Sequence, residues 1–386
     1  MSRSIVSFLK LRASWGRNGN VNVLNNYAYD STINYGGYWY QFDVDDPTPD
    51  YGSRPGGKAN PNLKWETSEQ WDVGLDARFF NNRLTLGIDW YKKMTKDLLV
   101  SVTPPAPVGV SSMTMNAGSV ENTGVELEMT WKDVIGDFSY SVSGNFSTLS
   151  NKVTYLDPSI TRLPGTGPQG VYLSTQFEQG YPIWYMRGLK ATGIDPATGK
   201  PSFEDLNGDG DIDTTNDMQM IGLGIPDVTY GLTINLAWKG LDMVIFGTGV
   251  AGNQIYPSSW RTDRPHCNTY AWYWQNSWKQ PGDNAKFPAA RYWTQETFSS
   301  TLNLFDGSFF KIKQIQLGYT LPKKIVNKAM ISNLRLYVSL ENFVTFTSYP
   351  GLDPETATAN TASSIGIDMG TYPTAKQLIF GVNLSF

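Results

Sequence analysis

The chain has 386 residues and a formal net charge of -4, from 31 Lys plus Arg against 35 Asp plus Glu. This balance gives no overall basic excess, so nucleic-acid binding is not predicted. One cysteine, Cys267, and one histidine, His266, exclude a disulfide within the chain and a zinc site built from several Cys and His ligands. The sequence also lacks a run of about 18 apolar residues, so no transmembrane helix is predicted.

Apolar and polar residues alternate with a period of two through most of the chain, which indicates β-strands. The predicted strands, in chain order, span 5–17, 71–79, 84–90, 125–131, 138–146, 230–238, 241–247, 315–321, 334–340 and 378–386. Tight turns at Asn81–Asn82, 132–137 and Lys239–Gly240 join three of the strand pairs into hairpins. The sequence therefore predicts an all-β fold of antiparallel strands.

The connections alternate between these tight turns and long segments rich in Gly, Pro, Asn and aromatic residues. The long segments span about residues 18–65, 101–117, 153–180, 253–305 and 347–375. A compact soluble domain rarely has so many long loops, whereas an outer-membrane barrel has short turns on one side and long loops on the other. The polar strand faces carry few charges, and Trp90, Tyr91, Trp131 and Trp238 end apolar strands. These features favour a transmembrane β-barrel over a soluble β-sandwich.

Seven stretches of the sequence, taken together and in the order in which they occur, are distinctive. They are NPNLKWETSEQWDVGLD (60–76), NAGSVENTGVELEMTW (116–131), DLNGDGDID (205–213), IPDVTYGLTINLAWKGLDMVIFGTGVAGN (225–253), FKIKQIQLGYTLP (310–322), LRLYVSLENFVTFTSYPGLDPE (334–355) and LIFGVNLSF (378–386). In this order they resemble the SusC/RagA family of TonB-dependent outer-membrane receptors. The motif YPGLDPE, followed by a final strand that ends in Phe, is the most specific part of the resemblance.

The resemblance implies a partial antiparallel transmembrane β-barrel, with residues 1–386 as the C-terminal portion of the receptor barrel. Plugged transporters of this class have 22 strands, and this chain is expected to supply about 10–12 of them. The plug and the TonB box of the family have no counterpart in the sequence. The chain is therefore expected to be a fragment that does not transport by itself.

The resemblance also implies a function. The intact protein would be a nutrient uptake receptor, not an enzyme, in the outer membrane of a Gram-negative, Bacteroidota-like cell. It would import oligosaccharides or peptides, with outer-membrane lipid around the barrel, a SusD-like lipoprotein as a lid and TonB as the energy source. Two alternatives stay open: a passive porin or enzyme barrel, and a soluble calcium-binding, carbohydrate-binding β-protein.

The same resemblance predicts the topology. The last strand, 376–386, would run toward the periplasm, with the tight turns periplasmic and the loops 18–65 and 253–305 outside. The number of strands would then be even. We expect 10 or 12, depending on whether 183–194 and 200–204 add a pair to the barrel wall.

The last nine residues form an alternating strand that ends on an aromatic side chain. The resemblance implies that the barrel assembly machinery reads this ending, with Phe380, Leu384 and Phe386 as the signal. Leu378 and Val382 complete the same apolar face, which is predicted to meet lipid. The opposite face is predicted to line the lumen. The alternative is an ordinary edge strand.

The sequence DLNGDGDIDTTND (205–217) follows the spacing of an EF-hand calcium loop. The candidate oxygen ligands are Asp205, Asn207, Asp209, Asp211, Asp213 and Asp217. Gly210 occupies the sharp turn at position 6, but position 12 is Asn216 instead of a bidentate Glu. Asp217 can serve only if the loop has a one-residue insertion. The pattern predicts a structural Ca²⁺ site without flanking helices, and the alternative is a turn that binds no metal.

The loop 253–305 is crowded with aromatic residues. The candidates for contact with a ligand or a lid are Trp260, Tyr270, Trp272, Trp274 and Trp278. Exposed aromatic rings stack on the apolar faces of sugars or pack in interfaces. The alternative is that these rings pack the loop on itself.

Overall fold

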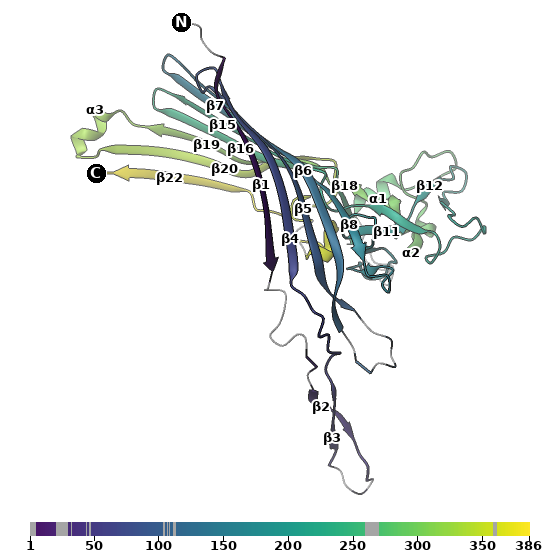
Figure 1. The fold of residues 1–386 in the computed structure, drawn as a ribbon. Helices are drawn as coiled ribbons and strands as arrows, with labels where there is room; N and C mark the ends of the chain where they lie inside the picture. Colours follow the sequence, from purple (N-terminus) through teal and green to yellow (C-terminus); the bar gives the residue numbers. More distant parts are fainter. Residues whose placement is uncertain are drawn as a thin grey trace.

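The computed structural model describes residues 5–20, 30–31, 33–43, 45, 48–102, 105, 107, 109–110, 113–258, 270–357 and 361–386. One broad, curved sheet forms most of the molecule, and a body of packed loops is attached at one end of it (Figure 1). The two-stranded hairpin of β2 (Ile33–Tyr40) and β3 (Asp50–Pro55) extends away from the sheet.

The broad sheet is an antiparallel wall of ten strands, in the order β1-β4-β5-β6-β7-β15-β16-β19-β20-β22. Their bounds are β1 (Val6–Asn20), β4 (Glu66–Phe79), β5 (Leu84–Val102), β6 (Met113–Ile135), β7 (Phe138–Thr148), β15 (Val228–Trp238), β16 (Leu241–Ala251), β19 (Phe309–Thr320), β20 (Asn333–Thr347) and β22 (Gln377–Ser385). An eleventh strand, β8 (Ser150–Leu156), follows β7 directly and pairs farther along β6. The sheet thus has eleven strands, of which ten form the continuous path across the wall. Because β8 continues the line of β7 along β6, the wall is ten strands wide, within the expected range of 10–12.

Strict alternation gives the wall one apolar face and one polar face. On the apolar face, Ile234 of β15 lies between Val142 of β7 and Ile245 of β16 in the strand register. The next residue, Asn235, lies on the polar face, where its amide donates a hydrogen bond of 3.1 Å to Ser141 Oγ. The polar face is therefore held together by hydrogen bonds between side chains of neighbouring strands.

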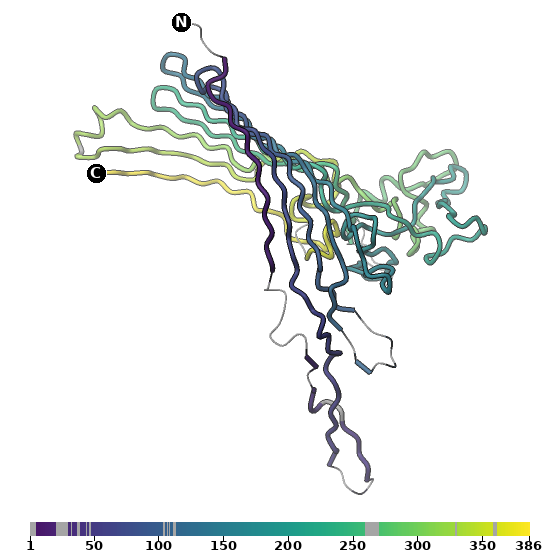
Figure 2. Tube along the Cα trace, viewed as in Figure 1, coloured from purple at the N-terminus to yellow at the C-terminus, as the bar shows by residue number. Residues whose placement is uncertain are grey.

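The tight turns all lie at one end of the wall, where β1 begins and β22 ends (Figure 2). Lys239 and Gly240 have φ values of 47° and 90°, which suits a two-residue turn of type I′. Asn81 and Asn82 have φ values of 59° and 63°, a conformation that Asn tolerates better than most residues. The predicted turns at Asn81–Asn82 and Lys239–Gly240 are therefore confirmed. The turn predicted at 132–137 is shorter, at Gly136 and Asp137, because β6 extends to Ile135.

The expected extra pair in 183–194 and 200–204 does form, but not in the wall. β12 (Ala191–Ile194) and β13 (Pro201–Phe203) make a separate two-stranded sheet in the loop body. β11 (Tyr185–Leu189) lies between β10 (Ser174–Phe177) and β14 (Met218–Gly222) in another small sheet. These strands cover other loops instead of crossing between the two ends of the wall.

Most wall strands are longer than the sequence pattern suggested, and β5 and β6 exceed it the most. β5 has 19 residues and β6 has 23, whereas a strand crosses a membrane in about 9–11 residues. Trp90 consequently lies inside β5, so the prediction that it ends an apolar strand was wrong. Trp131 and Trp238 do lie at the turn end, where Trp131 packs against Phe80 with ring centroids 6.0 Å apart.

Most of the buried hydrophobic core lies in the loop body, and one further cluster joins Val120 of β6 and Val153 of β8 to Phe177. Two of its clusters centre on Leu173, Met186, Tyr256 and Ile367, and on Tyr273, Phe287 and Phe298. The remaining strands are β9 (Leu163–Pro164), β17 (Gln254–Pro257), β18 (Phe305–Asp306) and β21 (Ile367–Asp368). The helices are α1 (Ala271–Asn276), η2 (Ala290–Tyr292), α2 (Gln295–Phe298), η3 (Thr301–Asn303), α3 (Lys323–Val326), η4 (Asn327–Ala329) and η5 (Ala362–Ser364). Within the described residues, none of them has the length and apolar character needed to span a membrane.

Candidate functional site

The candidate site lies where the polar face of the wall meets the loop body. Strand β19 carries Lys311 and Lys313 near this end. The register between β19 and β20 shifts just here, because Ile312 pairs with Val344 but Gln314 pairs with Glu341. Neighbouring residues of a regular strand point to opposite faces of the sheet, but a bulge can redirect a side chain. Here Lys313 and Gln314 both make polar contacts.

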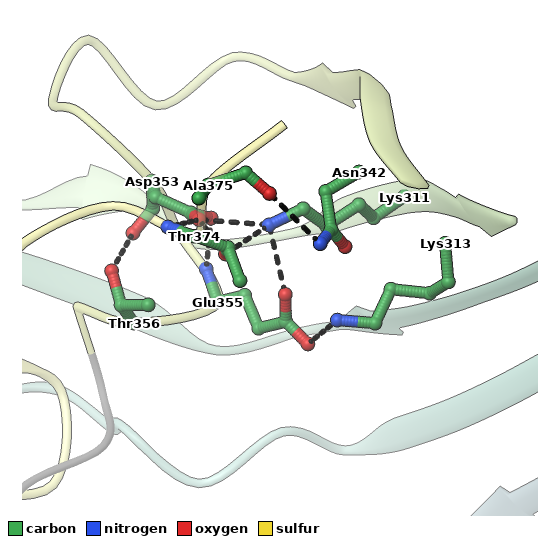
Figure 3. A network of polar contacts seen from close by, with 8 residues as sticks. All are labelled: Lys311, Lys313, Asn342, Asp353, Glu355, Thr356, Thr374 and Ala375. Carbon is green, nitrogen blue, oxygen red and sulfur yellow. Dashed lines mark hydrogen bonds and ion pairs between the residues drawn. The ribbon is translucent and has the colours of Figure 1, made fainter. Parts of the chain in front are cut away.

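Lys311 is the centre of a buried charge network (Figure 3). Its Nζ donates to Asp353 Oδ2 at 2.7 Å, to Glu355 Oε2 at 2.9 Å and to Thr374 Oγ1 at 2.6 Å. Lys313 Nζ donates to Glu355 Oε1 at 2.6 Å. The side chains of Lys311 and Asp353 are only 2% and 6% exposed. All three donors of the Lys311 ammonium are therefore used, which is the condition under which a buried charge is tolerated.

The network fixes both ends of the segment 348–376, which connects β20 to β22. Asp353 accepts hydrogen bonds from the backbone N–H of Thr374 at 3.1 Å and from its hydroxyl, and from the N–H of Glu355 at 3.1 Å. Asn342, in β20, donates its amide to the carbonyl of Ala375 at 3.2 Å (Figure 3). The start and the end of this 29-residue connection are thus held at the same place on the wall.

The two carboxylates of the segment titrate below their ordinary range. Burial by itself raises the pKa of Asp353, but hydrogen bonds from Lys311 and Thr374 outweigh it, so the net pKa is lowered. Burial likewise raises the pKa of Glu355, and hydrogen bonds from Lys313 and Lys311 reverse the effect. Both groups therefore stay ionised at neutral pH and keep their lysine partners.

These lowered pKa values predict that acid loosens the segment. A carboxylate whose pKa is lower in the folded state stabilises it above its unfolded pKa, about 4 for Asp and Glu, and that stability is lost as pH falls through the lowered pKa. We expect pepsin to cleave 348–376 of the full-length receptor faster at pH 3 than at pH 5. Each cleavage rate is divided by the rate on an unfolded substrate at the same pH, because the activity of pepsin itself depends on pH. An equal normalised rate at both pH values would contradict the prediction.

The same segment also joins separate parts of the loop body. Its strand β21 pairs in parallel with β17, and within the segment Tyr349 donates its hydroxyl to Asp368 Oδ2 at 2.6 Å. The carbonyl of Ser363 accepts the N–H of Thr166 at 3.1 Å. The YPGLDPE motif therefore begins a structural element that ties the wall to two other loops. Sequence reasoning did not find the Lys311 network, although two lysines in one strand and two acids in YPGLDPE were its visible signal.

A cavity of about 440 Å³ lies between the polar face of the wall and the loops. Its lining includes Asn145, Thr229, Phe246 and Thr248 from the wall and Asn253, Glu355 and Ile365 from the loops. Asn253 is buried, and its Oδ1 accepts no hydrogen bond from the described residues. A cavity of this size, lined by polar side chains such as Asn145 and Thr229, can hold several water molecules or part of a polar ligand.

The aromatic candidates of loop 253–305 separate into two groups. Trp272 contacts Phe305 edge to face with centroids 4.8 Å apart, and Trp278 Nε1 donates to the carbonyl of Pro196 at 2.9 Å. Both of these rings help to pack the loop body. Tyr270 and Trp274 are exposed, and Trp260 lies outside the described residues.

The space beside these aromatic rings is small. Tyr270 and Trp272 line a recess with Tyr349 and Asp368, and its volume is about 20 Å³, close to that of one water molecule. A sugar or peptide does not fit there. Ligand or lid contact by these aromatic residues stays a prediction, and Trp274 is the best placed for it because its ring is the most exposed of the four described.

The loop 205–217 folds as a series of tight polar turns. Asp205 accepts the N–H groups of Gly208 at 2.7 Å and Gly210 at 2.9 Å, and both glycines have positive φ. Asn207 donates its amide to Asp209 Oδ2 at 2.7 Å. These contacts show that several of the predicted ligands bond to the loop itself.

Asp217 has a structural role in this loop. It is buried and accepts the N–H groups of Leu206 at 2.8 Å and Asp213 at 2.7 Å, which closes the loop on itself. In the part of the chain that the structure describes, no three His, Cys, Asp or Glu side chains are grouped so that they could hold a metal. The carboxylates thus do not converge on a common centre, and the calcium site stays a prediction.

The final strand β22 lies at one edge of the wall and pairs only with β20 among the described strands. Phe380 and Leu384 lie opposite Val338 and Leu334, so they belong to the apolar face as predicted. Phe386 follows the strand and is exposed. The role of Phe380, Leu384 and Phe386 as a signal for the barrel assembly machinery stays a prediction.

Comparison with known proteins accounts for this architecture. Residues 5–343 match the family model described as TonB dependent receptor-like, beta-barrel. The chain belongs to the TonB-dependent receptor β-barrel family. TonB-dependent receptor P3 of Formosa agariphila is 33% identical over 352 residues, covering 85% of this chain and 35% of that protein. TonB-dependent receptor SusC of Bacteroides thetaiotaomicron is 30% identical over 403 residues, covering 99% of this chain and 38% of that protein.

Solved structures agree with this assignment. The RagAB peptide importer in its open-open state matches with a TM-score of 0.80 and 27% identity, over 99% of this chain and 40% of that chain. This receptor chain thus spans about two fifths of the length of these relatives. As predicted, it is SusC/RagA-like and forms part of an outer-membrane barrel wall. Contact of the apolar face with lipid stays a prediction. The names of these relatives describe receptors and a peptide importer.

Proposed function

We propose that the receptor containing this chain imports oligosaccharides or peptides across the outer membrane, with a SusD-like lipoprotein as its lid and TonB as its energy source. The observation that carries this proposal is the likeness of nearly the whole chain to a solved peptide importer, at a TM-score of 0.80. The geometry supports it as well. The polar face of the wall leads to a 440 Å³ cavity roofed by a packed loop body, which suits a ligand path more than an empty pore.

Uptake by living cells tests the substrate class. Cells with and without the receptor gene would be given two probe sets, fluorescent oligosaccharides and fluorescent peptides. We expect deletion to lower the uptake of one set at least about tenfold, and a protonophore to do the same in wild-type cells. Uptake that needs the gene but resists the protonophore would instead favour a passive porin, and no effect on either set would overturn the proposal.

The lid is tested separately by purification. A tagged full-length receptor, extracted in mild detergent, is expected to retain a lipoprotein of the SusD type in near-equal amount. The extracellular loop body would supply the contact, so a receptor that lacks residues 270–305 but keeps its wall should lose the lipoprotein. A receptor that purifies without any lipoprotein would contradict this part of the proposal.

We also propose that the 205–217 loop binds a structural Ca²⁺ ion, on the strength of its EF-hand-like spacing. Binding requires Asp205, Asn207 and Asp209 to turn some of their oxygens toward a shared centre. Isothermal titration of metal-stripped receptor with millimolar Ca²⁺ is expected to release heat, and Asp209→Ala is expected to abolish it. Asp195→Ala, at a turn outside the loop, is the matched control. No heat from the wild type would end the proposal.

A further inference from the structure

One connection at the turn end of the wall differs from the others. Residues 321–332, between β19 and β20, contain the short helices α3 and η4, whereas the hairpins near Asn82, Gly136 and Gly240 are closed by tight turns. Figure 1 shows α3 projecting from the end of these two strands. The connection carries Lys323, Lys324 and Lys328 within six residues, and all three side chains are exposed.

These three lysines lack the carboxylate partners that Arg83, Lys239 and Arg335 have at the same end of the wall. Arg83 pairs with Asp133 at 3.1 Å, and Lys239 pairs with Asp137 at 3.5 Å. Arg335 is likewise paired, with Asp242. No carboxylate of the described chain lies within 4 Å of Lys323, Lys324 or Lys328. The connection therefore presents a concentrated, uncompensated charge of three positive units.

Apolar side chains lie in the same connection. Ile325 is 58% exposed and Met330 is 87% exposed, whereas Val326 between them is buried and holds the turn in place. The strands that lead into and out of the connection bring the apolar pair Tyr319 and Leu336 close to it. Exposed apolar side chains therefore lie at the same end of the wall as the apolar pair Tyr319 and Leu336.

We propose that the connection 321–332 binds anionic phospholipid headgroups at the periplasmic boundary of the outer membrane. Barrels of this class keep their short turns on the periplasmic side, so the connection lies beside the inner leaflet. Ammonium groups attract the lipid phosphates, and Ile325 and Met330 enter the boundary between headgroups and acyl chains. This inference rests on the barrel topology and is independent of what the receptor transports.

The proposal is tested by measuring lipid binding to the full-length receptor in detergent. Native mass spectrometry gives the affinity for the first lipid molecule that binds. The probes are dioleoylphosphatidylglycerol and dioleoylphosphatidylcholine. We expect clear preference for phosphatidylglycerol, and about tenfold weaker binding of it when Lys323, Lys324 and Lys328 are all changed to Gln. The matched control changes Lys200, Lys279 and Lys286 to Gln, because these exposed lysines lie in the loop body, and it should bind as the wild type does.

Two further measurements separate lipid from other anions. Ile325→Ser with Met330→Ser keeps every charge and is expected to weaken phosphatidylglycerol binding severalfold, and inorganic phosphate at 10-fold excess over the lipid is expected not to displace it. Equal binding of both lipids by the wild type, or unchanged binding by the triple lysine variant, would overturn the proposal. Displacement by phosphate would do so too, because it would indicate an unspecific anion site.

Discussion

Replacing Lys311 with methionine is expected to release the 348–376 segment from the wall. Methionine keeps most of the side-chain volume but removes the ammonium, which leaves Asp353 buried without its counter-charge. Breaking a buried ion pair in this way costs about 3–5 kcal/mol. Amide hydrogen exchange of 348–376 in the full-length receptor should then rise by roughly a hundredfold or more, because about 1.4 kcal/mol corresponds to a factor of ten.

Lys313→Met is the matched control for this prediction. Its partner is Glu355, and both side chains are more than a quarter exposed, so the loss is expected to stay below about 1 kcal/mol. The double variant Lys311→Met with Asp353→Leu removes both buried charges and should recover part of the protection. If Lys311→Met exchanges no faster than Lys313→Met, the network does not hold the segment.

Phe298→Ala is expected to open the loop body while the wall stays intact. The side chain is fully buried and packs against Tyr273, Phe287 and Trp293 with centroids 5.9, 5.4 and 6.4 Å away. Truncating a buried Phe costs about 3–5 kcal/mol, from lost burial and the cavity left behind. Trypsin should therefore cut the full-length receptor within 270–305, while its heat-modifiable migration on gels stays normal.

Trp274→Ala provides the comparison. This ring is 58% exposed, and its main contact is the ammonium of Lys279, 5.7 Å from the ring centroid. An exposed cation–π contact is worth about 0.5–1 kcal/mol, so protease resistance should be close to that of the wild type. A fall in ligand uptake with unchanged protease resistance would assign Trp274 to ligand or lid contact. Equal protease sensitivity of the two variants would show that the aromatic cluster does not stabilise the loops.

Both experiments probe the region where sequence reasoning was weakest. The loop body depends on contacts between residues far apart in the chain: Lys311 and Asp353 are 42 residues apart, and Trp278 and Pro196 are 82 apart. No local pattern reports such contacts. The aromatic residues of loop 253–305 illustrate the difficulty, since an exposed binding ring and a packed ring have the same sequence signal. Only the structure separates Trp278, which is packed, from Trp274, which is exposed.

The wall, in contrast, could be predicted because its determinants are local. Alternating apolar and polar residues decide which side chains share a face, and turns such as Lys239–Gly240 require backbone conformations that few residues adopt. The antiparallel pairing and the approximate position of the tight turns therefore follow from the sequence, whereas the structure decided between 10 and 12 wall strands by placing β12 and β13 outside the wall. The tertiary structure decided the rest. The register shift beside Lys313 depends on how β19 pairs with β20, and the buried charges of Lys311 and Asp353 are stable only because a distant segment returns to the same place on the wall.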